Sequence, residues 1–355
     1  MIITCEQVSN GHPDKICDQI SDRLVDYIIA NSKSPRAGIE VLAKNNTFVF
    51  GGEYRSDISI DQAALKTVVE DTINDIGLSR TDYDLDRLEI INLLDQQSPD
   101  IAQGVDVGGA GDQGMMYGYA TDETPEMLPI PFVLATQLLR ELNLIRNPNL
   151  KGDAKAQVTF NYDTGMIQTF LCSVQHKSSI TNVEVSEIIV PIMQRIAERR
   201  KLNTNFNTLV NPTGRFVIGG TFADCGVTGR KLACDTYGGV GRIGGGNLGG
   251  KDPTKVDRSG AYMARKVAKT LIRLEMCKKC EVQIAYAIGE PLPISVNIEC
   301  FGSELVPISE IIDYVAKNYD FSPEGIIEYL DLWKVNYAKT ATFGHFGKSG
   351  FSWED

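Results

Sequence analysis

Apolar residues along the chain recur either at helical intervals of three and four or in short β-branched runs, and the two patterns alternate. The order helix, strand, strand, helix occurs three times. Each occurrence opens with a proline suited to the first turn of a helix, and these prolines, Pro13, Pro131 and Pro253, stand about 120 residues apart. The pattern therefore predicts an α+β fold of three pseudo-symmetric domains, each a β-sheet with helices packed on one face.

Each unit supplies two helices and two strands. The first has a helix from Pro13, strands at 39–43 and 47–50 joined by a hairpin at 44–46, and a helix at 61–76. The second has a helix from Pro131, strands at 157–162 and 166–174, and a helix from Val183. The third has a helix from Pro253 to about Glu275, strands at 282–288 and 294–300, and a helix from Ile308. Pro191 falls inside the predicted helix from Val183, so we expect a kink or a break there.

The domain boundaries follow from these units. We expect an N-terminal domain at residues 1–98, a central domain at 110–221 and a C-terminal domain at 222–355, with a short gating-loop segment connecting the first two at 99–109. The stretch 104–118 is rich in glycine and has too few apolar residues for a core element. It is therefore expected to be a ligand-covering loop or a plain linker.

The charge of the chain narrows the choice of partner. The net charge is −11, and both nucleic acid and an anionic membrane surface require a basic face, so neither is expected as a partner. No run of about 18 apolar residues and no charged and apolar leader is present, which predicts a cytoplasmic protein. The eight cysteines form no framework, and the CxxC of Cys277 and Cys280 has no second pair or histidine at zinc spacing. We therefore expect reduced, mostly structural thiols.

A glycine-rich run at residues 238–251, GGVGRIGGGNLGGK, is the strongest chemical signal. Backbone N–H groups of such a loop can close around an anion, although isolated glycine loops are often only tight turns. Asp252 suits the N-cap of the helix that Pro253 opens, and Lys251 and Lys255 add positive charge at that helix terminus. The run is not a P-loop, because Asp252 stands where Ser or Thr is needed and no apolar strand precedes it. This combination predicts a polyphosphate site.

Two further motifs carry functional groups. His12 is expected at the N-cap of the helix from Pro13, with Asp14 in its first turn as an exposed carboxylate available to a metal, or as a plain structural cap. Arg230 and Lys231 are either a phosphate clamp or a solvated pair. The sequence has no serine-elbow, zinc-protease or catalytic-cysteine signature. A polyphosphate site without a strong general base favours a nucleophile that needs no deprotonation, such as a thioether.

Five motifs in order resemble the signatures of S-adenosylmethionine synthetases (methionine adenosyltransferases). They are CEQVSNGHPDK at 5–15, GAGDQGMMYGYAT at 109–121, NPTGRFVIGG at 211–220, DCGVTGRK at 224–231 and GGKDPTKVDRS at 249–259. The resemblance covers nearly the whole chain. It implies that the sulfur of L-methionine attacks C5′ of ATP, and that the released tripolyphosphate is hydrolysed to pyrophosphate and phosphate. It also implies a homodimer with shared active sites, or a tetramer.

The resemblance also implies roles for individual residues by motif position. The catalytic residues would be His12, which donates a hydrogen bond to the leaving group, and the cations Lys155, Arg230, Lys251 and Lys255. ATP would contact His12, Asp153, Lys155, Arg215, Phe216, Asp224, Arg230, Lys231, Asn247 and Lys251. Methionine would contact Glu53, Gln97, Asp112, Asp224, Lys255 and Ile288. Mg²⁺, two ions per site, would bind Asp14 and Asp257, and K⁺ would bind Glu40.

The chain departs from the family pattern in two places near the site. The segment 101–110 is shorter than the usual gating loop, and Asn247 and Leu248 stand where the family commonly has Ala and Phe. Two other functions are weighed against synthesis of S-adenosylmethionine: hydrolysis of tripolyphosphate alone, and a non-catalytic regulatory family member. Both are disfavoured because every charged residue of the implied site is present, as are the methionine-side residues Glu53, Gln97 and Asp224.

Overall fold

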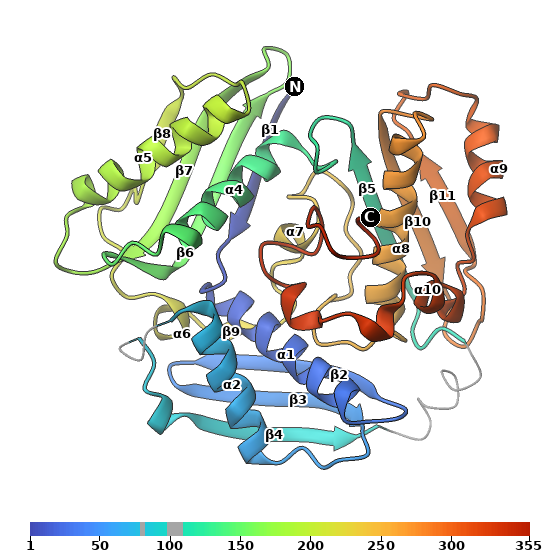
Figure 1. The fold of residues 1–355 in the computed structure, drawn as a ribbon, viewed down its shortest axis with the longest axis horizontal. Helices are drawn as coiled ribbons and strands as arrows, with labels where there is room; N and C mark the ends of the chain where they lie inside the picture. The colour runs from blue at the N-terminus through green and yellow to red at the C-terminus, as the bar shows by residue number, and fades with distance from the viewer. Residues whose placement is uncertain (79–81, 98–108) are drawn as a thin grey trace.

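The computed structural model describes residues 1–78, 82–97 and 109–355, which form three β-sheets with helices packed on them (Figure 1). The strand orders are β4-β3-β2-β9, β1-β6-β7-β8 and β11-β10-β5. The predicted α+β class with three sheet-and-helix domains is confirmed. The expected connecting segment at 99–109 lies almost wholly outside the described residues.

The first sheet carries two helices on one face. It comprises β2 (Arg36–Lys44), β3 (Thr47–Arg55), β4 (Glu89–Gln96) and the short β9 (Gly226–Val227). α1 (Pro13–Ala30) and α2 (Gln62–Ile76) cover it, with the 3-10 helix η1 (Leu85–Arg87) before β4. The predicted hairpin is present, with Asn45 in the left-handed region, and Gly77 ends α2 in the same conformation.

The second sheet is built from β1 (Ile2–Val8), β6 (Leu150–Asn161), β7 (Met166–His176) and β8 (Asn207–Val210). α4 (Ile130–Ile145) and α5 (Asn182–Arg199) pack on it around a separate apolar core. Of the kink or break expected at Pro191, the break is wrong, because α5 continues through this residue. Pro191 is exposed, so water can satisfy the backbone carbonyl that the missing N–H leaves free.

The third sheet comprises β5 (Gly114–Thr121), β10 (Lys279–Tyr286) and β11 (Ser295–Glu299). α8 (Val256–Arg273), α9 (Ile308–Asn318) and α10 (Pro323–Tyr329) accompany it, followed by the 3-10 helices η2 (Leu332–Lys334) and η3 (Tyr337–Lys339). We expected no core element within 104–118. This expectation is wrong, because β5 begins at Gly114 inside that stretch. A Cβ on Gly118 would lie 1.9 Å from the Ala264 carbonyl carbon, so glycine here lets α8 approach the strand closely.

Every sheet takes one strand from a distant part of the sequence. β1 pairs with β6, β5 pairs with β10, and β9 pairs with β2. The chain between β9 and α8 holds α7 (Leu232–Asp235) and the glycine-rich run, and it crosses the middle of the molecule beside the N-terminal end of α1 (Figure 1). None of the described helices is long and apolar enough to cross a membrane.

Candidate functional site

His12 ends the loop after β1 and caps α1, as predicted. Its Nδ1 accepts a hydrogen bond of 3.1 Å from the Asp14 amide, so a proton on the neutral ring sits on Nε2. Burial, with the nearby charges of Lys231 and Lys155, lowers the pKa of His12 to about 3. His12 is therefore neutral at physiological pH, and it can donate a hydrogen bond without carrying positive charge.

Asp14 is buried, and the expectation of an exposed carboxylate is wrong. β9 and the loop after it fold over Asp14: the Val227 amide donates to Oδ1 at 2.9 Å, and the Lys231 ammonium donates to Oδ2 at 2.6 Å. The Arg230 guanidinium lies 4.0 Å from Oδ1. Although burial alone would raise the pKa of Asp14, the bonds from Lys231 and Val227 lower it, and the carboxylate stays ionised.

Strand β6 brings further charges to the same place. The β1–β6 register sets Lys155 opposite Val8, close enough for its charge to act on His12. Asp153 accepts a 2.8 Å bond from the Gly220 amide, and burial raises its pKa to about 6. Asp224, at the end of α6 (Gly220–Ala223), is close enough to add to that rise. We call the following residues the His12 group: His12, Asp14, Asp153, Lys155, Asp224, Arg230 and Lys231.

The motif that precedes α6 is held beside this group. The Phe216 amide donates to Nε2 of His176 at 3.1 Å, and the His176 amide donates to the Phe216 carbonyl at 2.8 Å. Arg215 is exposed next to it. Gly226 has no room for a side chain, because a Cβ there would lie 2.3 Å from the Pro13 carbonyl oxygen. The close approach of β9 to α1 thus depends on this glycine.

A second set of charges surrounds the glycine-rich run. The Lys251 ammonium lies 2.5 Å from the Asp257 carboxylate, and a Cβ on Gly246 would lie only 2.0 Å from that carboxylate. Gly38 of β2 pairs with Glu53 of β3 on one side of the strand and with Lys251 on the other. Gln97 donates to Glu53 at 3.3 Å. We call the following residues the Lys251 group: Glu53, Gln97, Lys251, Lys255 and Asp257.

The start of α8 differs from the prediction. The helix begins at Val256 with Lys255 at the N-cap, whereas Asp252 and Pro253 were expected there. The buried Asp252 carboxylate accepts bonds from the Thr254 amide and hydroxyl, and it also binds the Ala37 amide at 2.7 Å. This separate turn delays the helix by one turn, and the Lys255 ammonium lies 3.1 Å from Asp252.

The structure does not bring the two groups together within one chain. β9 pairs with β2 at Leu42, whereas Lys251 bridges to β2 at Gly38. These two points are four residue steps apart along β2, a distance of about 13 Å. Glu40, which accepts a bond from Thr228, and Asn247, whose side chain lies against Gly229, stand between the groups. Asp112 and Ile288 are both exposed. They lie near each other at the end of the third sheet where β5 starts and β10 ends, because backbone hydrogen bonds join Ala110 to Gly289 and Glu290.

A row of aspartates on α1, which we did not predict, holds these loops in place. Besides Asp14, Asp18 accepts from the Gly229 amide at 2.9 Å and Asp22 accepts from the Gly250 amide at 2.8 Å. Asp22 also pairs with the buried Arg258, and Asp26 accepts from two amides of η3. The regular spacing of Asp14, Asp18, Asp22 and Asp26 places them on one helical face, and this periodicity was a usable signal.

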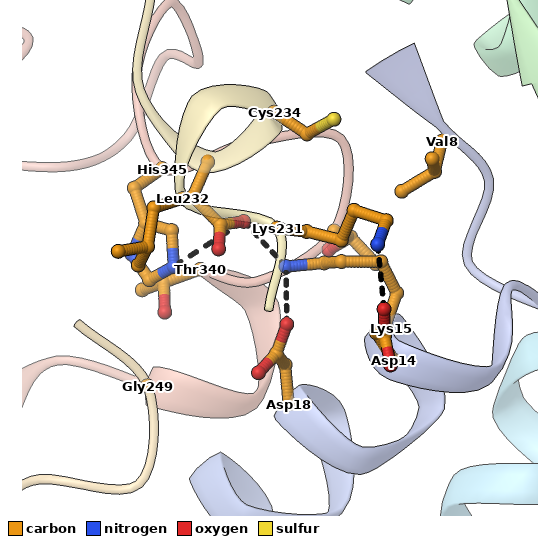
Figure 2. Close-up of polar contacts among 12 residues, drawn as sticks. Val8, Asp14, Lys15, Asp18, Lys231, Leu232, Cys234, Gly249, Thr340 and His345 are labelled. Carbon is orange, nitrogen blue, oxygen red and sulfur yellow. Dashed lines mark hydrogen bonds and ion pairs between the residues drawn. The ribbon is translucent and has the colours of Figure 1, made fainter. Parts of the chain in front are cut away.

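Lys15 extends this polar interior toward the C-terminal segment (Figure 2). Its buried ammonium lies between the carboxylates of Asp18, at 2.9 Å, and Asp235. Despite burial, these two carboxylates raise the pKa of Lys15, so it stays charged. Nε2 of His345 lies 4.0 Å from Asp235, and its Nδ1 is 2.8 Å from the Tyr262 hydroxyl. Sequence reasoning missed this network because Asp235 and His345 lie far from Lys15 along the chain.

Known proteins are similar to this chain along nearly its full length. Family models of the S-adenosylmethionine synthetase N-terminal, central and C-terminal domains match residues 1–99, 107–216 and 218–355. The chain belongs to the S-adenosylmethionine synthetase family. Among relatives of this family, the S-adenosylmethionine synthase of Mesoplasma florum is 43% identical over 99% of this chain and 97% of its own length. That of Maricaulis maris is 40% identical over 99% of this chain and 95% of its own length.

Proposed function

We propose that the protein synthesises S-adenosylmethionine from ATP and L-methionine. The relatives carry that activity in their names. The observation that carries the proposal is the His12 group: a neutral, buried histidine at a helix N-terminus stands among Lys155, Arg230 and Lys231. Such a site suits a polyphosphate leaving group, because fixed cations and helix N–H groups stabilise growing negative charge.

The reaction needs no base to activate the nucleophile. A lone pair of the methionine sulfur forms the bond to C5′ of ATP, while the C5′–oxygen bond breaks and its electron pair leaves with the triphosphate. The products are a sulfonium and tripolyphosphate. The Nε2–H of His12 is positioned to donate to the departing oxygen, since Nδ1 is occupied by the Asp14 amide. Water then cleaves tripolyphosphate to pyrophosphate and phosphate beside the same cations.

The remaining predicted contacts fit this arrangement. Lys155, Arg230 and Lys231 would bind the triphosphate together with Lys251 and Lys255. Asp153, Arg215, Phe216 and Asn247 would contact the nucleotide, and Asp224 would lie between nucleotide and methionine. Glu53, Gln97, Asp112 and Ile288 would form the methionine end, where carboxylates complement both the amino group and the sulfonium product.

The family uses metal ions, and the donor groups present suit Mg²⁺. Asp14 and Asp257 each offer an ionisable carboxylate that faces a lysine, and Mg²⁺ prefers one or two carboxylates together with substrate phosphates. When bound, two such ions would neutralise phosphate charge. The exposed Glu40 carboxylate beside Thr228 would ligate K⁺.

A homodimer would unite the two charged groups. The His12 group of one subunit would face the Lys251 group of the partner, because the two groups stand apart within one chain. Strands of the first and third sheets carry exposed apolar side chains that such an interface would bury: Leu42, Ile91, Leu93, Met115 and Val296. A tetramer would pair two such dimers.

Two experiments test the proposal. Pure protein incubated with ATP, methionine, Mg²⁺ and K⁺ should yield S-adenosylmethionine, pyrophosphate and phosphate by mass spectrometry. Phosphate release without the sulfonium would favour a tripolyphosphatase, and no turnover would favour a regulatory family member. Mixing inactive His12→Asn and Lys251→Ala subunits should restore about a quarter to a half of the activity, because one of the two sites in a mixed dimer is intact. Absence of recovery in verified mixed dimers would contradict shared sites.

A further inference from the structure

Three cysteines meet at one end of the third sheet. Cys277 precedes β10, Cys280 lies within it, and Cys300 follows β11. All three side chains are buried, and their sulfur atoms lie within 4.8 Å of one another. Among the described residues this is the one cluster of histidine, cysteine or acidic side chains with metal-ligand spacing. The expectation that the CxxC stands alone is therefore wrong, because the hairpin folds Cys300 onto it.

The backbone around the cluster has the form of a two-loop metal site. Glu281 pairs with Glu299, so the next residues outward, Cys280 and Cys300, lie opposite each other at the end of the hairpin. The sequence reads C-x2-C at 277–280 and C-x2-S at 300–303. The spacing between the two halves matches that of four-cysteine zinc sites, with Ser303 in the place of the fourth cysteine.

The loop after Cys300 is a tight turn, and all three cysteine side chains are buried. The Ser303 amide donates to the Cys300 carbonyl at 3.0 Å, and Phe301 and Gly302 are in the left-handed region. The Ser303 hydroxyl accepts a 2.9 Å bond from the Lys279 amide and thereby joins the two loops. The thiols of Cys280 and Cys300 hydrogen-bond to Cys277. The sulfurs thus converge on one point.

The charges that act on the sulfurs are carboxylates: Glu304 and Asp122 act on Cys277, and Glu299 acts on Cys300. A divalent cation among the sulfurs would offset this negative charge. Glu304, which forms an isolated backbone bridge with Cys277, is exposed and marks the solvent side of the cluster. The cluster is remote from the proposed catalytic groups. Cys280 pairs with Ala120 and Gly114 lies near Asp257, so about 20 Å of β5 separates them.

We propose that Cys277, Cys280 and Cys300 bind one zinc ion that closes the end of the β10–β11 hairpin. Three thiolates are the protein ligands, and an oxygen ligand from the solvent side completes the tetrahedron. Binding releases the three thiol protons and leaves a complex of charge −1. Zinc suits the site better than a disulfide, since a disulfide would join two sulfurs and leave the third buried without a partner. The ion is structural and takes no part in alkyl transfer.

The test measures metal on the full-length, reduced protein. After incubation with Zn²⁺ and gel filtration, elemental analysis should find one zinc per chain in the wild type and in a Cys172→Ala control. Cys172 is also a buried free thiol, but it lies in β7 of another sheet. Cys300→Ala should lose the zinc and melt at a lower temperature than the wild type. A wild type that binds no zinc, or a Cys300→Ala variant that keeps it, would overturn the proposal.

A second measurement avoids dependence on the folding of the variant. Titration of the metal-free wild type with Co²⁺ should produce a thiolate-to-cobalt charge-transfer band and the intense visible bands of a tetrahedral ion, with saturation at one equivalent. Octahedral cobalt without the charge-transfer band would refute the site. Thiol counting in denaturant under non-reducing conditions gives the remaining check. All eight cysteines should react after zinc removal, and two fewer would indicate a disulfide and contradict the proposal.

Discussion

Gly246→Ala tests whether the glycine-rich run sets the position of Asp257. The backbone φ of Gly246 lies outside the left-handed region, so alanine is permitted locally. Its Cβ, however, would lie 2.0 Å from Oδ1 of Asp257, and ordinary contact begins at 3.4 Å. Either the Asp257 carboxylate or the glycine-rich loop must therefore move by about 1.4 Å. Because this carboxylate also pairs with Lys251, the change displaces two proposed catalytic groups at once.

A displacement of this size should be visible in the rate. Misplacement by about 1 Å costs on the order of 10²-fold in turnover, or roughly 2.7 kcal/mol in the barrier. We expect such a fall in kcat for S-adenosylmethionine formation at saturating substrates, measured over a range of Mg²⁺ concentrations. Unfolding should be less affected, because Gly246 lies in a loop and not in a core element.

The neighbouring glycine gives a matched control. A Cβ on Gly245 would meet nothing within 4 Å, and its φ also permits alanine. Gly245→Ala should therefore retain near-native kcat, with a stability equal to the wild type or higher by about 0.5 kcal/mol. If Gly246→Ala turned over at the same rate as Gly245→Ala, the position of Asp257 would not depend on the loop, or Asp257 would not act in the reaction.

Three further predictions follow from the same contacts. Lys251→Ala should lower kcat on the order of 10²-fold with little change in methionine affinity, because the leaving group gains charge in the transition state; near-native kcat in steady-state assays would remove Lys251 from the triphosphate site. The folded-state pKa of His12, about 3, lies below the ordinary 6.5, so the unfolded chain takes up a proton that the folded chain does not. Its contribution to stability is therefore present above pH 6.5 and is lost as the pH falls, by about 2 kcal/mol at pH 5. His12→Asn, which still caps the helix, should lack this part of the pH dependence in urea unfolding, and an unchanged slope would contradict the neutral assignment. Gly118→Ala should destabilise the fold by about 3 kcal/mol, because its Cβ meets the α8 backbone, whereas Gly51→Ala, with nothing within 4 Å, should not; equal melting temperatures would refute the close contact.

Local patterns in the sequence predicted the elements well. Helices begin at or near Pro13, Pro131 and Ile308, and the hairpin at Asn45 lies where it was predicted. Most of the errors share a physical cause, which is contact between distant segments; at Pro191 the cause is instead the exposure of that residue to water. The sequence predicted Gly118 as a loop residue, whereas in the structure α8 packs against it. It predicted Asp252 as a helix cap, whereas in the structure the Asp252 carboxylate binds the Ala37 amide.

In the candidate site, too, local motifs were predictable from the sequence and contacts between distant segments were not. The sequence could name the members of the His12 group, because all of them except Asp153 and Lys155 lie in one of the five motifs, but their roles stay predictions. It could not show that Lys231 and Val227 cover Asp14, or that the Lys251 group stands at a different point of β2. Cys300 lacks a partner cysteine at the expected spacing, so only the hairpin register brings it to Cys277 and Cys280.

The exchange of strands among the three sheets has a consequence for synthesis on the ribosome. β1 emerges first, yet its partner β6 is translated about 150 residues later. The first sheet is likewise incomplete until β9, beyond residue 225, has been translated. β5 has no pairing partner until β10, past residue 278, has been translated. No sheet can therefore complete its hydrogen bonds while the nascent chain is short, and unpaired strand edges stay open to neighbouring chains in the meantime. We expect a strong need for chaperones during translation, and poor yields when any one of the three sheets is expressed as a continuous fragment.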